Sequence, residues 1–242
     1  MAASASRPGL IPVAWRAAGD FIAISVLGVC LGLLAMAGLY LFERWDSEAW
    51  LELAFGASML LVLLWWERKR PLPAAAVDVH RWPVRKAWLV GVLAGCVLLL
   101  GDQALLWLLE RGGLGEIEAS NDEPIRRALE AEPLLTVVSV GLLAPWLEER
   151  LIRGRLFARF RNAGHPWMGM LLTSGLFAML HEFAPDADQR LGEWLALIGL
   201  YTWAGVAFCL LYLWSGRLST AIAAHATNNL VACALLWLEG LA

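Results

Sequence analysis

The chain has 242 residues, of which 60% are hydrophobic, and its mean hydropathy is +0.61. Soluble domains contain about 45–50% apolar residues, so this composition excludes an ordinary water-soluble domain. The net charge of −3 is small, and the sequence has no basic patch with interleaved aromatic residues, which argues against nucleic acid as a partner. We therefore expect membrane lipids to surround much of this protein.

The apolar residues lie in long blocks, each able to cross a hydrocarbon layer of about 30 Å as a helix. In chain order the blocks are 21–42, 49–66, 88–109, 134–160, 166–183, 191–214 and 218–238. The uncharged core of the first block is longer than the roughly 7–15 residues of a signal peptide, so we expect it to be retained. The sequence therefore predicts an all-α, polytopic (multi-pass) membrane protein with about seven transmembrane helices.

Basic residues indicate how the helices are oriented. They concentrate in the segments 67–87 and 150–161, which lie on the side of the amino terminus if the chain crosses once per block. Because cytoplasmic loops are enriched in Lys and Arg, we expect the amino terminus in the cytoplasm. Only Lys69 and Lys86 are lysines. This preference for Arg, with the abundant Ala, Leu and Trp, favours a bacterial protein and hence the bacterial inner membrane.

The acidic segment 110–133 is long enough to form a feature outside the membrane. It contains Ser120-Asn121-Asp122-Glu123, which resembles a capping box at the start of a helix. We expect a short amphipathic helix over 125–132, lying at the outer interface of the membrane.

Several ionisable or strongly polar residues lie inside the apolar blocks, where each is costly unless it has a partner or a function. Asp102 lies in the third block, and its role is left open. Asn228 is turned away from the other polar residues of its helix and is interpreted as a packing residue. The remaining ones are Glu148, Glu149 and Arg153 in the fourth block, His181 in the fifth, and His225 and Asn229 in the seventh.

The spacing of these residues along their helices predicts that they meet. The fourth and fifth blocks form an antiparallel pair around a turn at 161–165. At a rise of 1.5 Å per residue, Glu148 lies about 18 Å and His181 about 22 Å from that turn. The seventh block starts on the same side, which places His225 about 12 Å and Asn229 about 18 Å along its helix. We therefore expect one polar cavity at a single depth in the membrane.

Helical periodicity distinguishes the two adjacent glutamates. Glu149 and Arg153 are spaced i,i+4 with the acid first, which is the favourable order for an ion pair. Glu148 is turned about 100° around the helix and is left free for chemistry. His225 and Asn229 share a face by the same i,i+4 spacing. A carboxylate, two imidazoles and an amide are groups that can activate water and stabilise an oxyanion.

Three short motifs carry these residues. They are Glu148-Glu149-Arg150-Leu151-Ile152-Arg153-Gly154, Phe177-Ala178-Met179-Leu180-His181 and His225-Ala226-Thr227-Asn228-Asn229. In this order they resemble the EExxxR, FxxxH and HxxxN motifs of the CAAX prenyl endopeptidase type II family, also called CPBP or ABI. The resemblance covers about residues 130–240, and Ile152 stands where relatives often have Phe. It divides the chain into amino-terminal helices with the outer interfacial segment (1–133) and a CPBP-like protease core formed by the last four helices (134–242).

The resemblance implies an intramembrane endopeptidase that cleaves near the carboxyl terminus of a lipidated or membrane-associated peptide or protein substrate. Glu148 would be the general base that activates water, assisted by His181. His225 and Asn229 would bind the developing oxyanion, and Arg153 would hold and orient the glutamate pair. The sequence contains no feature that defines the oligomeric state.

The resemblance leaves open whether zinc takes part. Two His and one Glu suit a zinc ion with water in an open position. The amide beside the second His and the Arg beside the glutamates suit water bound by hydrogen bonds alone. We favour a glutamate-type enzyme without a cofactor, because the spacing does not fit short zinc motifs such as HExxH.

Two functions from other classes compete with a peptidase. Buried Glu and His can form the ion path of a transporter or proton relay, although no inverted repeat is visible and no block is broken by Gly or Pro near its middle. A catalytically silent scaffold or immunity factor would be expected to have lost a motif residue, and all the motif residues are present.

Overall fold

The computed structural model describes residues 8–41, 48–72, 80–115, 117–185 and 189–239. The secondary structure of these residues is entirely helical. Five helices in this part of the chain are long and apolar enough to cross a membrane. They are α1 (Leu10–Leu41), α2 (Glu48–Lys69), α3 (Val84–Leu109), α9 (Leu191–Ser215) and α10 (Leu218–Glu239). The prediction of an all-α, multi-pass membrane protein is confirmed.

The expected number of seven transmembrane helices is not confirmed. The fourth block is a helix with two π-helical stretches: α5 (Pro133–Val138), η3 (Ser139–Leu143), α6 (Ala144–Glu149), η4 (Arg150–Phe157) and α7 (Ala158–Asn162). The fifth block is α8 (Pro166–His181), which has only 16 residues. The fourth block carries too many charged residues, and α8 is too short, for either to count among the long apolar helices.

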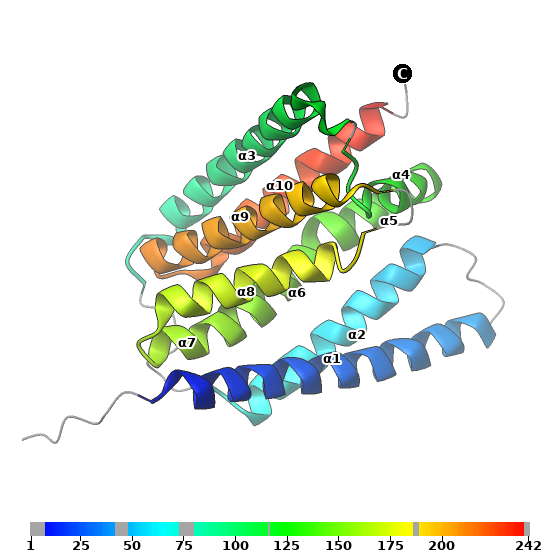
Figure 1. The fold of residues 1–242 in the computed structure, drawn as a ribbon. Coiled ribbons are helices and arrows are strands. Elements are labelled where there is room, and N and C mark those ends of the chain that lie inside the picture. The colour runs from blue at the N-terminus through cyan, green and yellow to red at the C-terminus, as the bar shows by residue number, and fades with distance from the viewer. Residues whose placement is uncertain (1–7, 42–47, 73–79, 116, 186–188, 240–242) are drawn as a thin grey trace, which may run out of the picture.

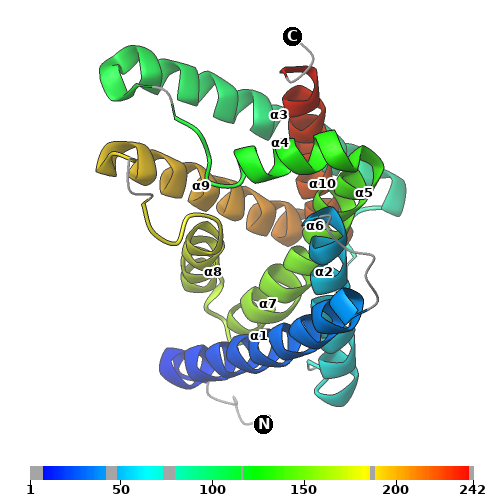
Figure 2. The ribbon, with the colours of Figure 1, turned by 90° about the vertical axis from the view of Figure 1, so that its right-hand side faces the viewer.

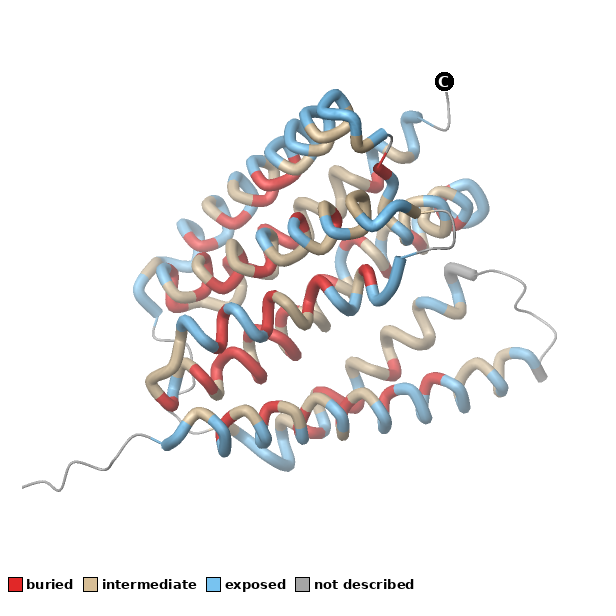
Figure 3. Tube along the Cα trace, viewed as in Figure 1, coloured by how far each residue is buried: buried red, intermediate tan, exposed pale blue. Residues whose placement is uncertain are grey.

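In the bundle, α10 packs against α3 and α9, and α9 packs against α8, with α1 and α2 paired along one flank (Figure 1). The broken helix from α5 to α7 lies between that pair and the rest. Buried residues concentrate where the inner helices face one another, and the outer faces of α1 and α3 are exposed (Figure 3). Those exposed faces carry large apolar side chains such as Leu34, Leu89 and Val97, as expected for surfaces in contact with lipid.

The first helix begins earlier than expected, at Leu10 instead of residue 21. The reason is Asp20, a buried carboxylate that interrupted the apolar block in the sequence but is neutralised in the fold. It accepts hydrogen bonds from Arg155 Nε at 2.9 Å, Arg159 Nε at 2.7 Å and Trp66 Nε1 at 3.2 Å. These contacts fasten α1 and α2 to the broken helix that carries the first sequence motif.

A close contact between backbones sets the position of α3 against α10. A Cβ atom added to Gly95 would lie 2.3 Å from the Ala224 carbonyl oxygen and 2.8 Å from Thr227 Cβ. Gly91 makes a similar approach one turn earlier on the same face. Small residues of this kind let transmembrane helices pack closely. The contact fixes which residues of α3 face α10.

Replacing Gly95 by Ala is expected to lower the free energy of unfolding by about 1–3 kcal/mol, because an inserted methyl group must push two backbones apart. The matched control is Gly101→Ala on the same helix, where an added Cβ has nothing within 4 Å. Thermal unfolding in detergent, followed by circular dichroism, makes the comparison. Equal midpoints for the two variants would show that α3 and α10 do not pack in this way.

The acidic segment forms the expected short helix, α4 (Asp122–Ala131), whose buried face includes Ala128 and Leu129. Figure 2 shows it lying across the end of the bundle near the carboxyl terminus. The capping-box interpretation was wrong, because no side chain caps the helix start. The Ser120 hydroxyl instead donates to the carbonyl oxygen of His181 at 3.1 Å, which ties the segment to the end of α8.

Candidate active site

Glu149 is fully buried and joins two of the sequence motifs. Its Oε1 accepts a hydrogen bond from Arg153 Nη1 at 2.7 Å, one turn along the same helix, as the i,i+4 spacing predicted. The same oxygen lies 3.0 Å from Nδ1 of His225 on α10. A carboxylate oxygen paired with Arg153 acts as an acceptor, so His225 Nδ1 is the donor of this bond. Glu149 therefore fixes the ring orientation of His225.

The guanidinium of Arg153 is enclosed by aromatic rings as well as by its carboxylate partner. It lies 4.5 Å from the ring centre of Phe177 and 5.2 Å from that of Phe208. Its Nη2 donates to the carbonyl oxygen of Gly205 at 3.2 Å. Cation–π contacts of this kind compensate in part for removing a charge from water. Arg153 thus links the motif helix to α8 and α9.

Glu148 is turned away from the ion pair and faces both imidazoles. Its Oε2 lies 3.9 Å from His181 Nε2 and 3.9 Å from His225 Nε2. These distances exceed a direct hydrogen bond and suit a single water molecule bridging the groups. The Glu148 side chain is 29% exposed, whereas that of Glu149 is fully buried. The two adjacent glutamates therefore occupy different environments.

His181 is held with its Nε2 toward Glu148. Its Nδ1 lies 2.9 Å from the carbonyl oxygen of Phe177, one turn earlier on α8. A carbonyl can only accept, so Nδ1 is the donor, and in the neutral form of the ring Nε2 has a free lone pair. The ring also stacks on Tyr201 with centroids 4.5 Å apart. Both histidines thus present Nε2 to the same carboxylate oxygen.

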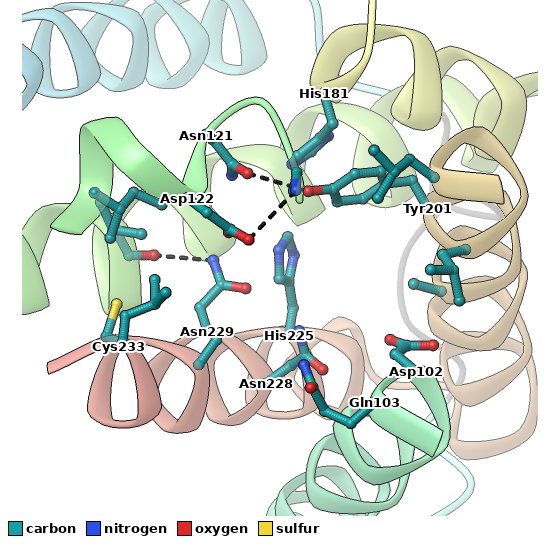
Figure 4. Close-up of a pocket in the computed structure, with 18 of the residues that line it drawn as sticks. Asp102, Gln103, Asn121, Asp122, His181, Tyr201, His225, Asn228, Asn229 and Cys233 are labelled. Carbon is teal, nitrogen blue, oxygen red and sulfur yellow. Dashed lines mark hydrogen bonds between the residues drawn. The ribbon is translucent and has the colours of Figure 1, made fainter. Parts of the chain in front are cut away.

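Both histidines line a cavity of about 170 Å³ between α3, α8, α9 and α10. In Figure 4, His181, Tyr201 and His225 border one part of this cavity, and side chains from α3, α4 and α10 border the rest. The polar residues there are Asp102, Gln103, Asn121, Asp122, Asn228 and Asn229. Three of the predicted site residues, His181, His225 and Asn229, line this cavity, whereas Glu148 is not among its lining residues and faces the two imidazoles from beside it.

Asn229 and Asn228 both lie at this cavity. Asn229 Nδ2 donates to the carbonyl oxygen of Val140 at 3.0 Å, within the π-helical stretch η3. One of its two amide hydrogens is therefore used to join α10 to the broken helix. Asn228 was interpreted as a packing residue; it also lines the cavity, and its buried Oδ1 has no hydrogen-bond partner among the described residues.

The segment before α4 covers the cavity at the end of α8. Ser120 N donates to Glu182 Oε1 at 3.0 Å, and the Tyr201 hydroxyl donates to Asn121 Oδ1 at 3.3 Å. Glu182 is only 1% exposed; in the sequence it could not be distinguished from a loop residue. Asp122 Oδ2 accepts a hydrogen bond from the backbone N–H of Ala119 at 3.4 Å. Burial of the Asp122 carboxyl raises its pKa above the usual value.

The residues can be tested for their fit to zinc. One carboxylate and two imidazoles are a suitable donor set, with zinc bonds of about 2.0–2.1 Å and hence about 3.3 Å between ligands of a tetrahedral site. The observed separations of 3.9 Å would have to shorten by about half an ångström. Among the described residues, no group of three or more His, Cys, Asp or Glu is arranged to hold a metal ion. The donor set is chemically suited to zinc, and its separations are longer than those between the ligands of a tetrahedral zinc site.

These features define a class: an all-helical, multi-pass membrane protein with a carboxylate and two imidazoles gathered between its helices. Residues 130–231 match the family model described as type II CAAX prenyl endopeptidase Rce1-like, which shows a domain of this type in that part of the chain. The match includes the three motifs, and it supports an intramembrane protease that acts on a peptide or protein. No significant match was found among curated proteins or solved structures.

Proposed function

We propose that this protein is a glutamate-type intramembrane endopeptidase that hydrolyses a peptide bond near the carboxyl terminus of a lipidated or membrane-associated substrate. The observation that carries the proposal is the position of Glu148 Oε2, 3.9 Å from Nε2 of both His181 and His225. A water held by these three groups is next to a base and to two further hydrogen-bonding atoms, as hydrolysis requires.

In the proposed reaction, Glu148 takes a proton from this water while the water oxygen attacks the scissile carbonyl carbon. His181, with a lone pair on Nε2, orients the water. The carbonyl oxygen becomes an oxyanion, which accepts a hydrogen bond from protonated Nε2 of His225 and from the second amide hydrogen of Asn229. Glu148 then returns the proton to the leaving nitrogen as the carbon–nitrogen bond breaks.

Glu149 and Arg153 act as positioning residues in this proposal. Glu149 accepts a hydrogen bond from Nδ1 of His225, which leaves Nε2 of the same ring directed at Glu148. Arg153 pairs with Glu149 and holds it in place. The resemblance assigned Arg153 to both glutamates, but its bond is to Glu149 alone among the described pairs. The proposal therefore separates a catalytic glutamate from a supporting one.

Two alternatives differ in what the same residues do. In the zinc version, Glu148, His181 and His225 would hold the ion, which would supply a bound hydroxide at neutral pH. In the transporter version, the buried Glu and His would relay protons across the membrane. The family match favours the peptidase. We further propose that the protein resides in a bacterial inner membrane with its amino terminus in the cytoplasm.

The test is cleavage of a library of lipidated and unlipidated carboxyl-terminal peptides by the purified, reconstituted protein, with products identified by mass spectrometry. His225→Ala is expected to lower the cleavage rate by about 10²- to 10³-fold, the usual effect of losing one oxyanion donor. The matched control is His80→Ala, because His80 is exposed in a loop and its loss should leave the rate unchanged. If neither the wild-type protein nor the variants cleave any peptide, and the wild-type protein carries protons across liposome membranes, the transporter is favoured.

Metal removal separates the two peptidase mechanisms. Cleavage by wild-type protein is expected to survive exhaustive treatment with a chelator such as 1,10-phenanthroline, because the proposed base is a carboxylate. Loss of activity on chelation, followed by recovery on adding zinc, would replace the glutamate mechanism with the zinc version.

A further inference from the structure

Asp102 is an ionisable residue that the proposed reaction does not use. It lies in the apolar helix α3, and among the described residues it forms no ion pair or hydrogen bond with a side chain. A lone carboxylate within a membrane span is costly and calls for a partner. The sequence left its role open between lining a cavity, pairing with an Arg and lying near the outer interface. The structure places it in the wall of the cavity that also contains His181 and His225.

The packing of α3 explains why Asp102 faces this cavity. Gly95 lies against the backbone of α10, and Asp102 follows it by seven residues, which returns to the same helix face after two turns. In Figure 4 the Asp102 carboxylate points into the cavity, on the side formed by α3 and α10. Gln103 and Asn228 border the same side.

The polar atoms of the cavity divide into those with a partner and those without one. Asn121 Oδ1 is bonded to Tyr201, and Asp122 Oδ2 to the backbone of Ala119. The buried Oδ1 of Asn228 has no such partner among the described residues, and no hydrogen bond or ion pair joins the Asp102 carboxylate to a described residue. Both are hydrogen-bond acceptors, and none of the described residues that line the cavity is a Lys or Arg. The amide groups of Gln103 and Asn228 are the donors on this side, so the Asp102 carboxylate faces no cationic partner there.

We propose that Asp102 is a specificity-determining residue that binds a cationic side chain, Lys or Arg, of the substrate. Asn228 Oδ1 accepts a second hydrogen bond from the same group or from the adjoining peptide N–H. The site would then accept an otherwise apolar membrane segment that carries one basic residue close to the cleaved bond. This inference rests on the proposed function, because it concerns the choice of substrate by the peptidase. The binding preference that it predicts can be measured without cleavage.

The experiment measures binding to the Glu148→Gln protein, in which cleavage is not expected. The probes are six apolar hexapeptides that carry Arg at successive positions, each paired with the same peptide carrying citrulline, which has nearly the same shape without the charge. The best Arg peptide is expected to bind at least tenfold more tightly than its citrulline partner. This arm needs no change at Asp102, so it does not depend on whether an Asp102 variant folds.

The second arm assigns the preference to Asp102. Adding Asp102→Asn should reduce the tenfold preference to less than threefold, and Asp102→Glu should keep it. Adding Glu130→Gln, which removes an exposed acid outside the cavity, should leave it unchanged. Equal binding of Arg and citrulline peptides, no binding of either, or a preference that persists in Asp102→Asn would overturn the inference. Cleavage by the wild-type protein is scored separately, so failure of the proposed function remains distinguishable.

Discussion

Replacing Glu148 by Gln is expected to lower the rate of peptide cleavage by about 10²- to 10⁴-fold, the usual contribution of a positioned general base. Gln has nearly the same shape as Glu but cannot take a proton from water. Glu148 is not part of the buried ion pair, and it is 29% exposed, so the fold should remain. Single-turnover cleavage of a substrate found with the wild-type protein measures the effect on the chemical step.

The matched control for this change is Glu130→Gln, in which an exposed glutamate of α4 loses its charge. Its cleavage rate should equal that of the wild-type protein. Thermal midpoints of both variants verify that the folded fraction is the same. A Glu148→Gln protein that is folded and cleaves within threefold of the wild-type rate would remove Glu148 as the base.

Replacing Arg153 by Met is expected to destabilise the protein by about 3–5 kcal/mol, because a buried charge loses its partner. Both side chains of the pair Glu149–Arg153 are fully buried, so Glu149 would be left ionised without compensation or would become protonated. Either outcome also weakens the hydrogen bond between Glu149 and His225 Nδ1. Unfolding in mixed detergent micelles, with increasing SDS, gives the difference in the free energy of unfolding.

Removing both charges together should be less harmful than removing Arg153 alone. In Glu149→Gln/Arg153→Met, no unpaired charge remains in the interior, so part of the stability should return. The control is Arg127→Met, because Arg127 and Glu123 form a pair with both side chains 59% exposed, and such surface pairs contribute only about 0–1 kcal/mol. A double variant as unstable as the sum of its two single variants would contradict direct pairing within the interior.

The gathering of the site could be predicted from the sequence because helices convert residue spacing into distance. The constant rise of a helix predicted that Glu148, His181 and His225 lie at one depth. In the structure, Glu148 Oε2 lies 3.9 Å from Nε2 of each histidine. The i,i+4 spacing likewise predicted the bond between Glu149 and Arg153. These predictions depend only on local geometry within each helix and on one shared turn.

Contacts that depend on how helices rotate against one another could not be predicted. The bond between Glu149 and His225 joins residues 76 positions apart and needs the actual helix packing. The same is true of Asn228, which faces the cavity. The π-helical stretches η3 and η4 flank the glutamate pair and shift side chains away from the face that a regular helix would give them. No residue pattern marked them in advance.

The limits of the helices were also misjudged where a charge is neutralised at a distance. In the sequence, the charge of Asp20 set the start of the first apolar block at residue 21, yet α1 begins before it. The residues that neutralise Asp20, Arg155 and Arg159, lie more than a hundred positions away in the chain, so the sequence did not reveal them. The division at residue 133 into amino-terminal helices and a protease core stays a prediction, and the family match begins close to it, at residue 130.

The most direct test of the central claim is an electron-density map from X-ray diffraction by crystals of the protein grown in a lipid mesophase, at a resolution that shows ordered water. We expect one density within about 3 Å of Glu148 Oε2 and of Nε2 of both His181 and His225, the hydrogen-bonding distance of a shared water. Anomalous scattering at the zinc edge should show no signal there. A Glu148 carboxylate directed at lipid, or separated from either imidazole by more than one water can bridge, would contradict the account.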